Sequence, residues 1–311
     1  MTKTMDIKST LRDNTTEKLK NRQKFQVLLP YLLLTSPAII LFFVFHTYPA
    51  LQGIFYSFTN WPGYGDFQFV GLKNYLNLFK DTRILNSYIF TFEFAIISTI
   101  IVNLLSLVLA ILLNENIKWK KLIRAVYFLP YVLSILIIGF IFNYIFMTII
   151  PGLATKLGIT SLTRNILGIP NLAWIGVVFV TVWQAAALNT LLYLTGLQTI
   201  PDELYEAAEI DGAGRWVQFR RVTFPLIAPF FTINMVLAMR NFLTVFDQIM
   251  ALTEGGPGRA TESISILIYR GGFQGSEFAF QSANAVVYFL IILAVSIIQV
   301  QYLQKREVTM E

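Results

Sequence analysis

Polar side chains inside two long apolar stretches are the residues of this chain that could do chemistry. The stretch 172–197 contains Thr181, Gln184 and Asn189. The stretch 226–250 contains Asn234, Arg240, Asn241, Thr244, Asp247 and Gln248. Side-chain amides both donate and accept hydrogen bonds, so such a set could bind the hydroxyl groups of a ligand. Polar groups in apolar helices are costly and commonly functional, although they also bond neighbouring helices to one another.

Covalent and metal chemistry have little support in the sequence. There is no cysteine, and His46 is the only histidine. A membrane-embedded enzyme would need a nucleophile, a metal cluster or a carboxylate pair at depth. The apolar stretches contain only two acidic residues, Asp247 and Glu93. These two leave one alternative function open, an ion-coupled secondary transporter.

The elements that must position these side chains are membrane helices. The chain has 311 residues, of which 55% are hydrophobic and 14% charged, whereas soluble domains carry about 25% charged residues. Stretches of about 20 apolar residues cross a bilayer. Six such stretches predict an all-α integral membrane protein with spans at 25–48, 89–113, 125–150, 172–197, 226–250 and 281–303. Pro30, Pro37 and Pro49 predict kinks in the first span.

The distribution of basic residues predicts the orientation. With the N-terminus inside, 16 Lys and Arg residues fall on the inner side and seven on the outer side, which makes both ends cytoplasmic by the positive-inside rule. The hydrophilic residues 1–24 lack the features of a signal peptide, so we expect a cytoplasmic tail there and a second short tail at 306–311. The net charge of +6 is explained by this topology, and no nucleic-acid partner is expected.

One polar segment, Glu206 to Pro225, has internal organisation. Pro201 followed by acidic residues favours a helix start, and Gly212 and Gly214 can supply the left-handed residues that end a helix and form a turn. A basic and aromatic stretch from Arg215 follows. The pattern predicts two short helices joined by a sharp turn on the cytosolic side. A soluble partner could grip such a segment, or an amphipathic helix could rest on the lipid surface.

At this point the residues carry a resemblance. Glu206-Ala207-Ala208, Gly212 and the closing Val222-Thr223-Phe224-Pro225 resemble the EAA loop of ABC-importer permeases, with Val222 and Phe224 departing conservatively from the family's Ile-x-Leu-Pro ending. The inner Ile210-Asp211-Gly212-Ala213-Gly214 and three further stretches resemble the carbohydrate-uptake (maltose and glycerol-phosphate) branch of that family. The three stretches are Leu197–Pro201, Val70-Gly71-Leu72-Lys73-Asn74-Tyr75, and Phe246-Asp247-Gln248 leading to Leu252–Pro257. The resemblance covers about residues 25–305, the expected six-helix permease domain.

The resemblance implies how the protein is driven. The loop 198–225 would dock into a cytosolic ATPase subunit, with Glu206 paired to a basic residue of that subunit and Gly212 forming the turn. The implied coupling residues are Glu206, Ala207, Ala208, Asp211, Gly212 and Pro225. The chain has no GxxxxGK[ST] phosphate-binding loop. ATP and Mg²⁺ would therefore be bound by a partner, and no cofactor or metal is expected on this chain.

The resemblance also implies a substrate pathway. Positions that line the sugar site of the maltose-type permease fall here on Thr181, Gln184, Ala185, Leu188, Ala238, Asn241, Phe242 and Val245. The adjacent Arg240 could contact an anionic substrate through a bidentate bond. Alternatively, it could pair with Asp247 or with Glu93.

The sequence is thus interpreted as a type I ABC-importer permease for a sugar, in a prokaryotic cell membrane and without catalysis of its own. A second related permease, two ATPase subunits and an extracytoplasmic solute-binding protein are the implied partners.

Overall fold

The computed structural model describes residues 30–115 and 118–305, and the chain divides between Tyr56 and Ser57 into two compact units. The described part of the first unit is a helical span, Pro30–Tyr56, that ends in α2 (Tyr48–Tyr56). The predicted first span stopped at residue 48, so the helix is eight residues longer than expected at this end. Residues 25–29 of that prediction and both predicted tails lie outside the described residues.

The second unit contains the remaining described elements. Its helices are α3 (Lys73–Leu78), α4 (Thr82–Asn114), α5 (Lys120–Val132), α6 (Ile135–Tyr144), α7 (Ile150–Leu157), α8 (Pro170–Leu197), α9 (Asp202–Ile210), α10 (Arg215–Gln218), α11 (Phe224–Leu226), α12 (Ala228–Leu243), α13 (Asp247–Leu252), α14 (Ile264–Tyr269) and α15 (Phe278–Gln304). Short 3₁₀ and π-helical turns connect several of them. The described residues contain one isolated β-bridge, Thr59 to Phe69, and no strand.

Three π-helical turns have one cause, a proline two residues beyond the end of each turn. The turns are Phe43–Thr47, Ile145–Ile149 and Phe219–Thr223, and the prolines are Pro49, Pro151 and Pro225. Because proline has no N–H, it leaves a carbonyl of the preceding turn without its usual donor. The residue before each proline instead bonds the carbonyl five positions back, as Tyr48 N–H does with Phe43. The chain absorbs the defect as a wider turn without ending the helix.

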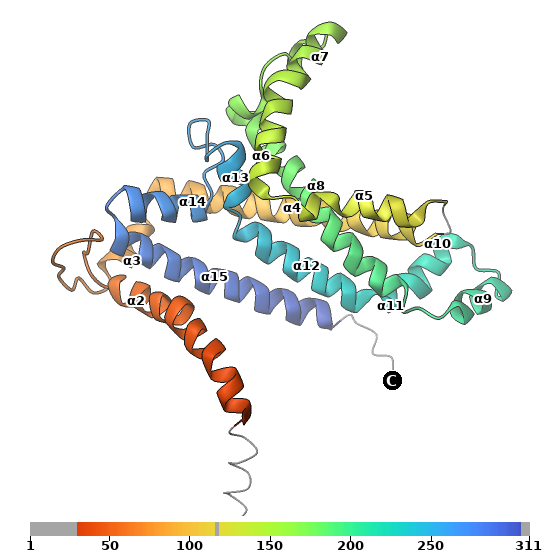
Figure 1. The fold of residues 1–311 in the computed structure, drawn as a ribbon, viewed down its shortest axis with the longest axis horizontal. Coiled ribbons are helices and arrows are strands. Elements are labelled where there is room, and N and C mark those ends of the chain that lie inside the picture. The colour runs from red at the N-terminus through yellow and green to blue at the C-terminus, as the bar shows by residue number, and fades with distance from the viewer. Residues whose placement is uncertain (1–29, 116–117, 306–311) are drawn as a thin grey trace, which may run out of the picture. The chain divides into compact units, whose positions relative to one another are not determined.

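Helices α4 and α8 form the centre of the second unit. Helix α4 has 33 residues and contains neither glycine nor proline, and the Asp81 carboxylate caps it by accepting from Arg83 N–H at 2.8 Å. Small buried residues let α4 and α8 approach closely, and Ser106 Oγ donates to the Ala186 carbonyl at 3.3 Å. Helix α12 packs on both α4 and α15 (Figure 1).

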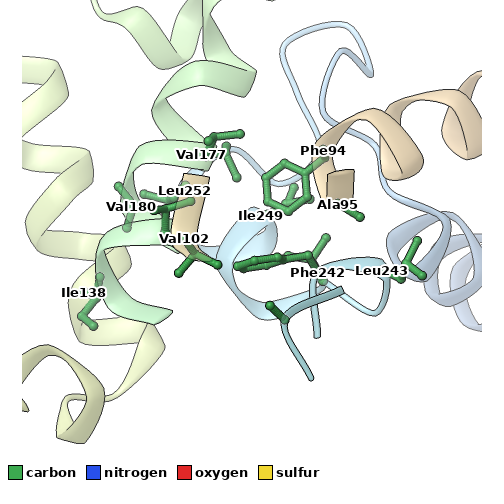
Figure 2. Close-up of a cluster of buried hydrophobic side chains, with 14 of the residues drawn as sticks. Phe94, Ala95, Val102, Ile138, Val177, Val180, Phe242, Leu243, Ile249 and Leu252 are labelled. Atoms are coloured by element: carbon green, nitrogen blue, oxygen red, sulfur yellow. The ribbon is translucent and has the colours of Figure 1, made fainter. Parts of the chain in front are cut away.

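A hydrophobic core joins α4, α8, α12 and α13 (Figure 2). The rings of Phe94 and Phe242 meet edge to face with their centroids 6.2 Å apart, and Ile249 of α13 is fully buried beside them. Nearer the C-terminal ends of α4 and α8, the Tyr193 hydroxyl donates to Asn103 Oδ1 at 2.6 Å. Asn234 Nδ2 of α12 donates to the Asn189 carbonyl at 3.2 Å. These buried polar contacts hold α4, α8 and α12 together.

Two predicted spans are broken where the sequence suggested continuous helices. The prediction 125–150 divides at extended Leu133 and Ser134, three residues after Pro130 removes a backbone donor. The prediction 226–250 bends by 68° at Ile227, between Pro225 and Pro229, and breaks again at 244–246. There the Thr244 hydroxyl bonds the Arg240 carbonyl, and Ser263 Oγ donates to the Val245 carbonyl at 3.0 Å. Side chains thus replace part of the helical bonding.

The prediction of a helical, multi-span protein is confirmed. Within the described residues, five helices are long and apolar enough to cross a membrane, or six if the bent pair Arg215–Leu226 and Ala228–Leu243 counts as one span.

Candidate functional site

A cavity of about 630 Å³ lies beside the middle of α8, between the two helix breaks. Its walls come from α8, from the α5–α6 break and from the α12–α13 break. Seven of the nine predicted pathway residues line it, namely Thr181, Gln184, Ala185, Leu188, Asn241, Phe242 and Val245. The tertiary structure therefore brings residues of two distant segments into one hollow. Contact of these residues with a substrate stays a prediction.

The helix breaks give this cavity its polar character. Irregular backbone at membrane depth is tolerated only where it is buried in protein or lines a water-filled space. Here Leu133, Ser134 and Ile135 line the cavity at one break, and residues 244–248 line it at the other. Ser134 precedes the first turn of α6, and its side chain does not cap that turn. Backbone donors and a free hydroxyl are therefore available to a ligand at this wall.

The polar side chains of the cavity differ in how many of their donors and acceptors are still free. Thr181 Oγ1 donates to the Val177 carbonyl, and Asn189 Nδ2 donates to the Ala185 carbonyl. Both side chains therefore already use a donor within α8. Gln184 is 8% exposed, and its Oε1 has no partner among the described residues. A buried acceptor without a donor is costly. A ligand hydroxyl that donated to Gln184 Oε1 would remove that cost. Asn241 is exposed towards the same space.

Two predicted pathway residues do not line the cavity. Ala238 is 2% exposed and belongs to the hydrophobic core. Arg240 is exposed on α12, on the helix face that also carries Asn241 and Thr244. The expected pairing of Arg240 with Asp247 or Glu93 is absent, because the one ion pair within residues 30–115 and 118–305 joins Arg83 to Glu262. Arg240 and Asp247 are seven residues apart, but the helix breaks between them at 244–246, so they do not share one helix face.

Sequence reasoning missed the wall formed by the α5–α6 break. Tyr131, Leu133, Ser134 and Ile135 all line the cavity, but they fell inside a stretch interpreted as one continuous span. The available signal was Pro130 followed closely by Ser134, since interrupted hydrophobic segments point to binding sites in transporters. Asp247 and Gln248 were noted as polar but were not placed in the pathway, and they also line the cavity.

Most of the predicted coupling residues lie on an exposed segment away from the cavity, helix α9 and the turn after it. Helix α9 starts at Asp202 immediately after Pro201 and ends at Ile210, and Gly212 follows with φ +77° as predicted. The Gly212 N–H bonds the Glu209 carbonyl, and the Ala213 N–H bonds the Ala208 carbonyl, both at 2.9 Å. These two bonds make a Schellman ending, which defines the turn.

A hydrogen bond connects α9 to the second part of the coupling segment, which leads into α11 and α12. Gly214 is extended rather than left-handed and precedes α10. The Tyr205 and Thr223 hydroxyls are 3.0 Å apart, so α9 is bonded to the turn that leads into α11. Glu206, Ala207, Asp211 and Gly212 are exposed, Ala208 and Pro225 are half-buried, and Ile210 is 88% exposed. The segment is a braced, solvent-facing projection.

The two acids of the alternative function do not share a site. Asp247 lines the central cavity, whereas Glu93 lines a different hollow with Asn86 and Trp174. Within the described part of the chain, no three His, Cys, Asp or Glu residues are grouped so that they could hold a metal ion.

Known proteins resemble this chain over most of its length. The model of the family described as binding-protein-dependent transport system inner membrane component matches residues 102–308. The probable starch degradation products transport system permease protein AmyD of Thermoanaerobacterium thermosulfurigenes is 39% identical over 90% of this chain and 96% of its own. The multiple sugar-binding transport system permease protein MsmF of Streptococcus mutans is 39% identical over 87% and 93%.

A solved structure shares the fold. A bacterial ABC transporter described as involved in the import of the acidic polysaccharide alginate matches with a TM-score of 0.80. The match covers 93% of this chain and 99% of that one at 23% identity. The ABC-importer permease fold predicted from the sequence is therefore confirmed. Together, the family model and the relatives place this chain in the family of binding-protein-dependent transport system inner membrane components, as a permease subunit of an ABC importer.

Proposed function

We propose that this chain forms part of the translocation pathway of an ATP-driven importer for a sugar, by alternating access. The observation that carries the proposal is the central cavity, where amide groups, backbone donors and a carboxylate surround a space of about 630 Å³ at the middle of α8. Sugar hydroxyls both donate and accept hydrogen bonds, and this wall presents both kinds of partner. The relatives named for starch products and for multiple sugars support the substrate class.

Within the cavity, we assign recognition to the groups that have free hydrogen-bonding capacity. Gln184 Oε1 would accept from a sugar hydroxyl, and the Asn241 amide and the Asp247 carboxylate would complete the polar set. The ring of Tyr131 would cover an apolar face of the sugar. Ala185, Leu188 and Val245 would shape the space. Arg240 would lie just outside it on the same face of α12.

The free energy for transport would come from ATP hydrolysis on a separate subunit. We assign α9 and the Gly212 turn to docking in a cleft of a cytosolic ATPase subunit, which would bind ATP and Mg²⁺. A rigid-body movement is transmitted well by a braced helix, and the Tyr205–Thr223 hydrogen bond supplies the brace. The full assembly would contain a second, homologous permease, two ATPase subunits and an extracytoplasmic solute-binding protein. Both termini would be cytoplasmic.

The test reverses one charge on α9. In the reconstituted transporter, Glu206→Arg should lower the uptake of labelled oligosaccharides and the substrate-stimulated ATP hydrolysis by at least about tenfold, since breaking an interfacial charge pair costs about 2–5 kcal/mol. Glu209→Arg is the matched control, with the same change three residues later on the same exposed helix, and should retain most activity. Full activity of Glu206→Arg would refute the coupling assignment.

A further inference from the structure

A bent helix connects the coupling segment to α12. This stretch, Arg215–Leu226, comprises α10, the π-helical turn Phe219–Thr223 and α11, and it is bent by 68° from α12 (Figure 1). We call it the basic helix. Membrane helices are tilted by about 20° on average from the bilayer normal, so the basic helix lies at about 50–90° from that normal. It therefore runs close to the plane of the membrane surface, over a length of about 18 Å.

One side of the basic helix is held against the protein. Val222 and Leu226 pack on the hydrophobic cluster that contains the fully buried Ile227. Thr223 is 6% exposed, and its hydroxyl lies 3.0 Å from the Tyr205 hydroxyl of α9. These contacts fix the rotation of the helix about its own axis. The residues on the other side are therefore presented outward in a defined way.

The outward side combines two charges with apolar and aromatic groups. Trp216, Arg220 and Phe224 recur every four residues, and Val217 and Arg221 follow them by one position. All five are exposed, Trp216 by 71% and Phe224 by 38%. Within residues 30–115 and 118–305, neither Arg220 nor Arg221 has an ion pair or a side-chain hydrogen bond. Their guanidinium groups are available to an anion from outside the chain.

A ladder of rings links this outward side to the membrane span. The centroids of Trp216 and Phe219 are 5.6 Å apart, those of Phe219 and Phe224 are 6.1 Å apart, and those of Phe224 and Phe231 of α12 are 5.6 Å apart. Tryptophan is enriched at the headgroup level of a bilayer. Long basic side chains beside it can place their charges among the headgroups. The basic helix thus has the composition of a helix at a membrane surface.

The charges favour lipid over the cytosolic ATPase subunit as the partner of this surface. Helix α9, with the sequence DELYEAAEI, has four acidic residues and no basic one, whereas the basic helix has three arginines and no acidic residue. A protein surface that attracts α9 is basic and repels the guanidinium groups of Arg220 and Arg221. Phosphate, by contrast, accepts two parallel hydrogen bonds from a guanidinium group.

We propose that the outward side of the basic helix binds the headgroups of anionic phospholipids. Arg220 and Arg221 contact the phosphate groups, and Trp216 and Phe224 lie among the uppermost acyl carbons. With the proposed orientation, these lipids belong to the cytoplasmic leaflet. The bond from Tyr205 to Thr223 joins α9 to the anchored helix, so the lipid contact holds the base of the coupling segment at the membrane surface. That coupling role rests on the proposed function, but the lipid contact itself does not.

The experiment uses Trp216 as a fluorescent reporter. The other four tryptophans are replaced by phenylalanine, and the assembled transporter is placed in nanodiscs of phosphatidylcholine. Phosphatidylglycerol with acyl chains brominated near the headgroup then replaces part of that lipid. A parallel series uses phosphatidylcholine with the same brominated chains. Bromine quenches tryptophan fluorescence on contact, so the two series report how well each headgroup competes for the surface around Trp216.

We expect half-maximal quenching at an about fivefold lower mole fraction of phosphatidylglycerol than of phosphatidylcholine, a ratio that corresponds to about 1 kcal/mol. Arg220→Gln combined with Arg221→Gln should abolish this preference. Arg220→Lys combined with Arg221→Lys should retain it, because both charges stay. The control Arg164→Gln, which removes an exposed arginine between α7 and α8, should also retain it.

A salt titration of the parent protein gives a second measurement, which stands even if the glutamine variant fails to fold. Raising the ionic strength from about 0.1 M to about 1 M shortens the Debye length from about 10 Å to about 3 Å. The preference for phosphatidylglycerol should then fall below about twofold. A preference that is the same at both salt concentrations would contradict a contact made by exposed charges.

Three further results would overturn the proposal. The first is equal quenching by both lipids in the parent protein. The second is a preference that survives the glutamine pair or is lost equally in the lysine pair, which would assign it to side-chain packing. The third is the absence of quenching in the assembled transporter, which would mean that another subunit covers the basic helix. The measurement needs neither sugar nor ATP, so its failure is distinguishable from failure of the proposed function.

Discussion

Adding one methyl group at Gly139 should disturb the wall of the central cavity. Gly139 of α6 lies against Ala251 of α13, and a Cβ built on Gly139 would lie 2.4 Å from the Ala251 Cβ and 3.3 Å from its carbonyl carbon and oxygen. Non-bonded carbon atoms prefer about 3.5–4.0 Å. In Gly139→Ala, helix α13 must therefore move by about 1 Å or more relative to α6.

The cost can be estimated from two opposing effects. Overpacking a close contact costs about 1–3 kcal/mol, whereas replacing glycine by alanine within a helix gains about 0.5–1 kcal/mol. We expect a net destabilisation of about 1–2 kcal/mol, or a fall in the melting temperature of about 2–8 °C for a domain of this size. Asp247 and Gln248 precede Ala251 on α13 and line the cavity. Uptake should therefore fall even below the melting temperature.

The assay is thermal unfolding of the purified protein followed by intrinsic fluorescence, with uptake measured in parallel. Gly152→Ala is the matched control, because nothing lies within 4 Å of its added Cβ in α7, and it should be neutral or slightly stabilising. In the double variant Gly139→Ala with Ala251→Gly, the colliding Cβ is gone, so stability should return to within about 1 kcal/mol of the parent. Strictly additive losses in the double variant would refute the steric reasoning.

Two further predictions concern buried polar contacts. Arg83 Nε and Nη2 donate to the two Glu262 oxygens at 2.9 and 2.7 Å, and Glu262 is 2% exposed. Because the Arg83 side chain is 36% exposed, Glu262→Gln should cost about 1–3 kcal/mol, less than a fully buried pair; an unchanged denaturation midpoint would contradict this. Tyr193→Phe should cost about 1 kcal/mol by leaving Asn103 Oδ1 buried without its donor. Adding Asn103→Leu should then cost less than it does in the parent protein, and full additivity would argue against a coupled pair.

The coupling segment was largely predictable from sequence because its geometry is local. Pro201, the acidic first turn and Gly212 specify the start and end of α9 through contacts no more than five residues apart. Gly214 was the exception, since its extended conformation depends on where α10 begins. The bond from Tyr205 to Thr223 spans 18 residues and could not be predicted from a capping pattern.

The pathway residues were less predictable. Resemblance placed Gln184 and Asn241 at the cavity, and the structure brings them to one hollow. The same reasoning placed Ala238 there, although it packs into the core one turn away on α12. A residue that lines the cavity and a residue buried in the core can thus lie one helical turn apart. Only the packing of α12 against α4 and α15 determines which face of α12 points toward the core.

By itself, the sequence determined the class of the protein, its apolar spans and the shape of its coupling helix, because hydropathy, capping and proline chemistry act over a few residues. Tertiary structure alone decided what the breaks in the spans enclose and how their free backbone groups are satisfied. A helix can end at Thr244 inside a membrane only because Ser263, 18 residues from Val245, satisfies the freed carbonyl. It can end at Leu133 because the exposed backbone lines a cavity instead of lipid. Such compensation comes from residues distant in the chain, so no local pattern encodes it.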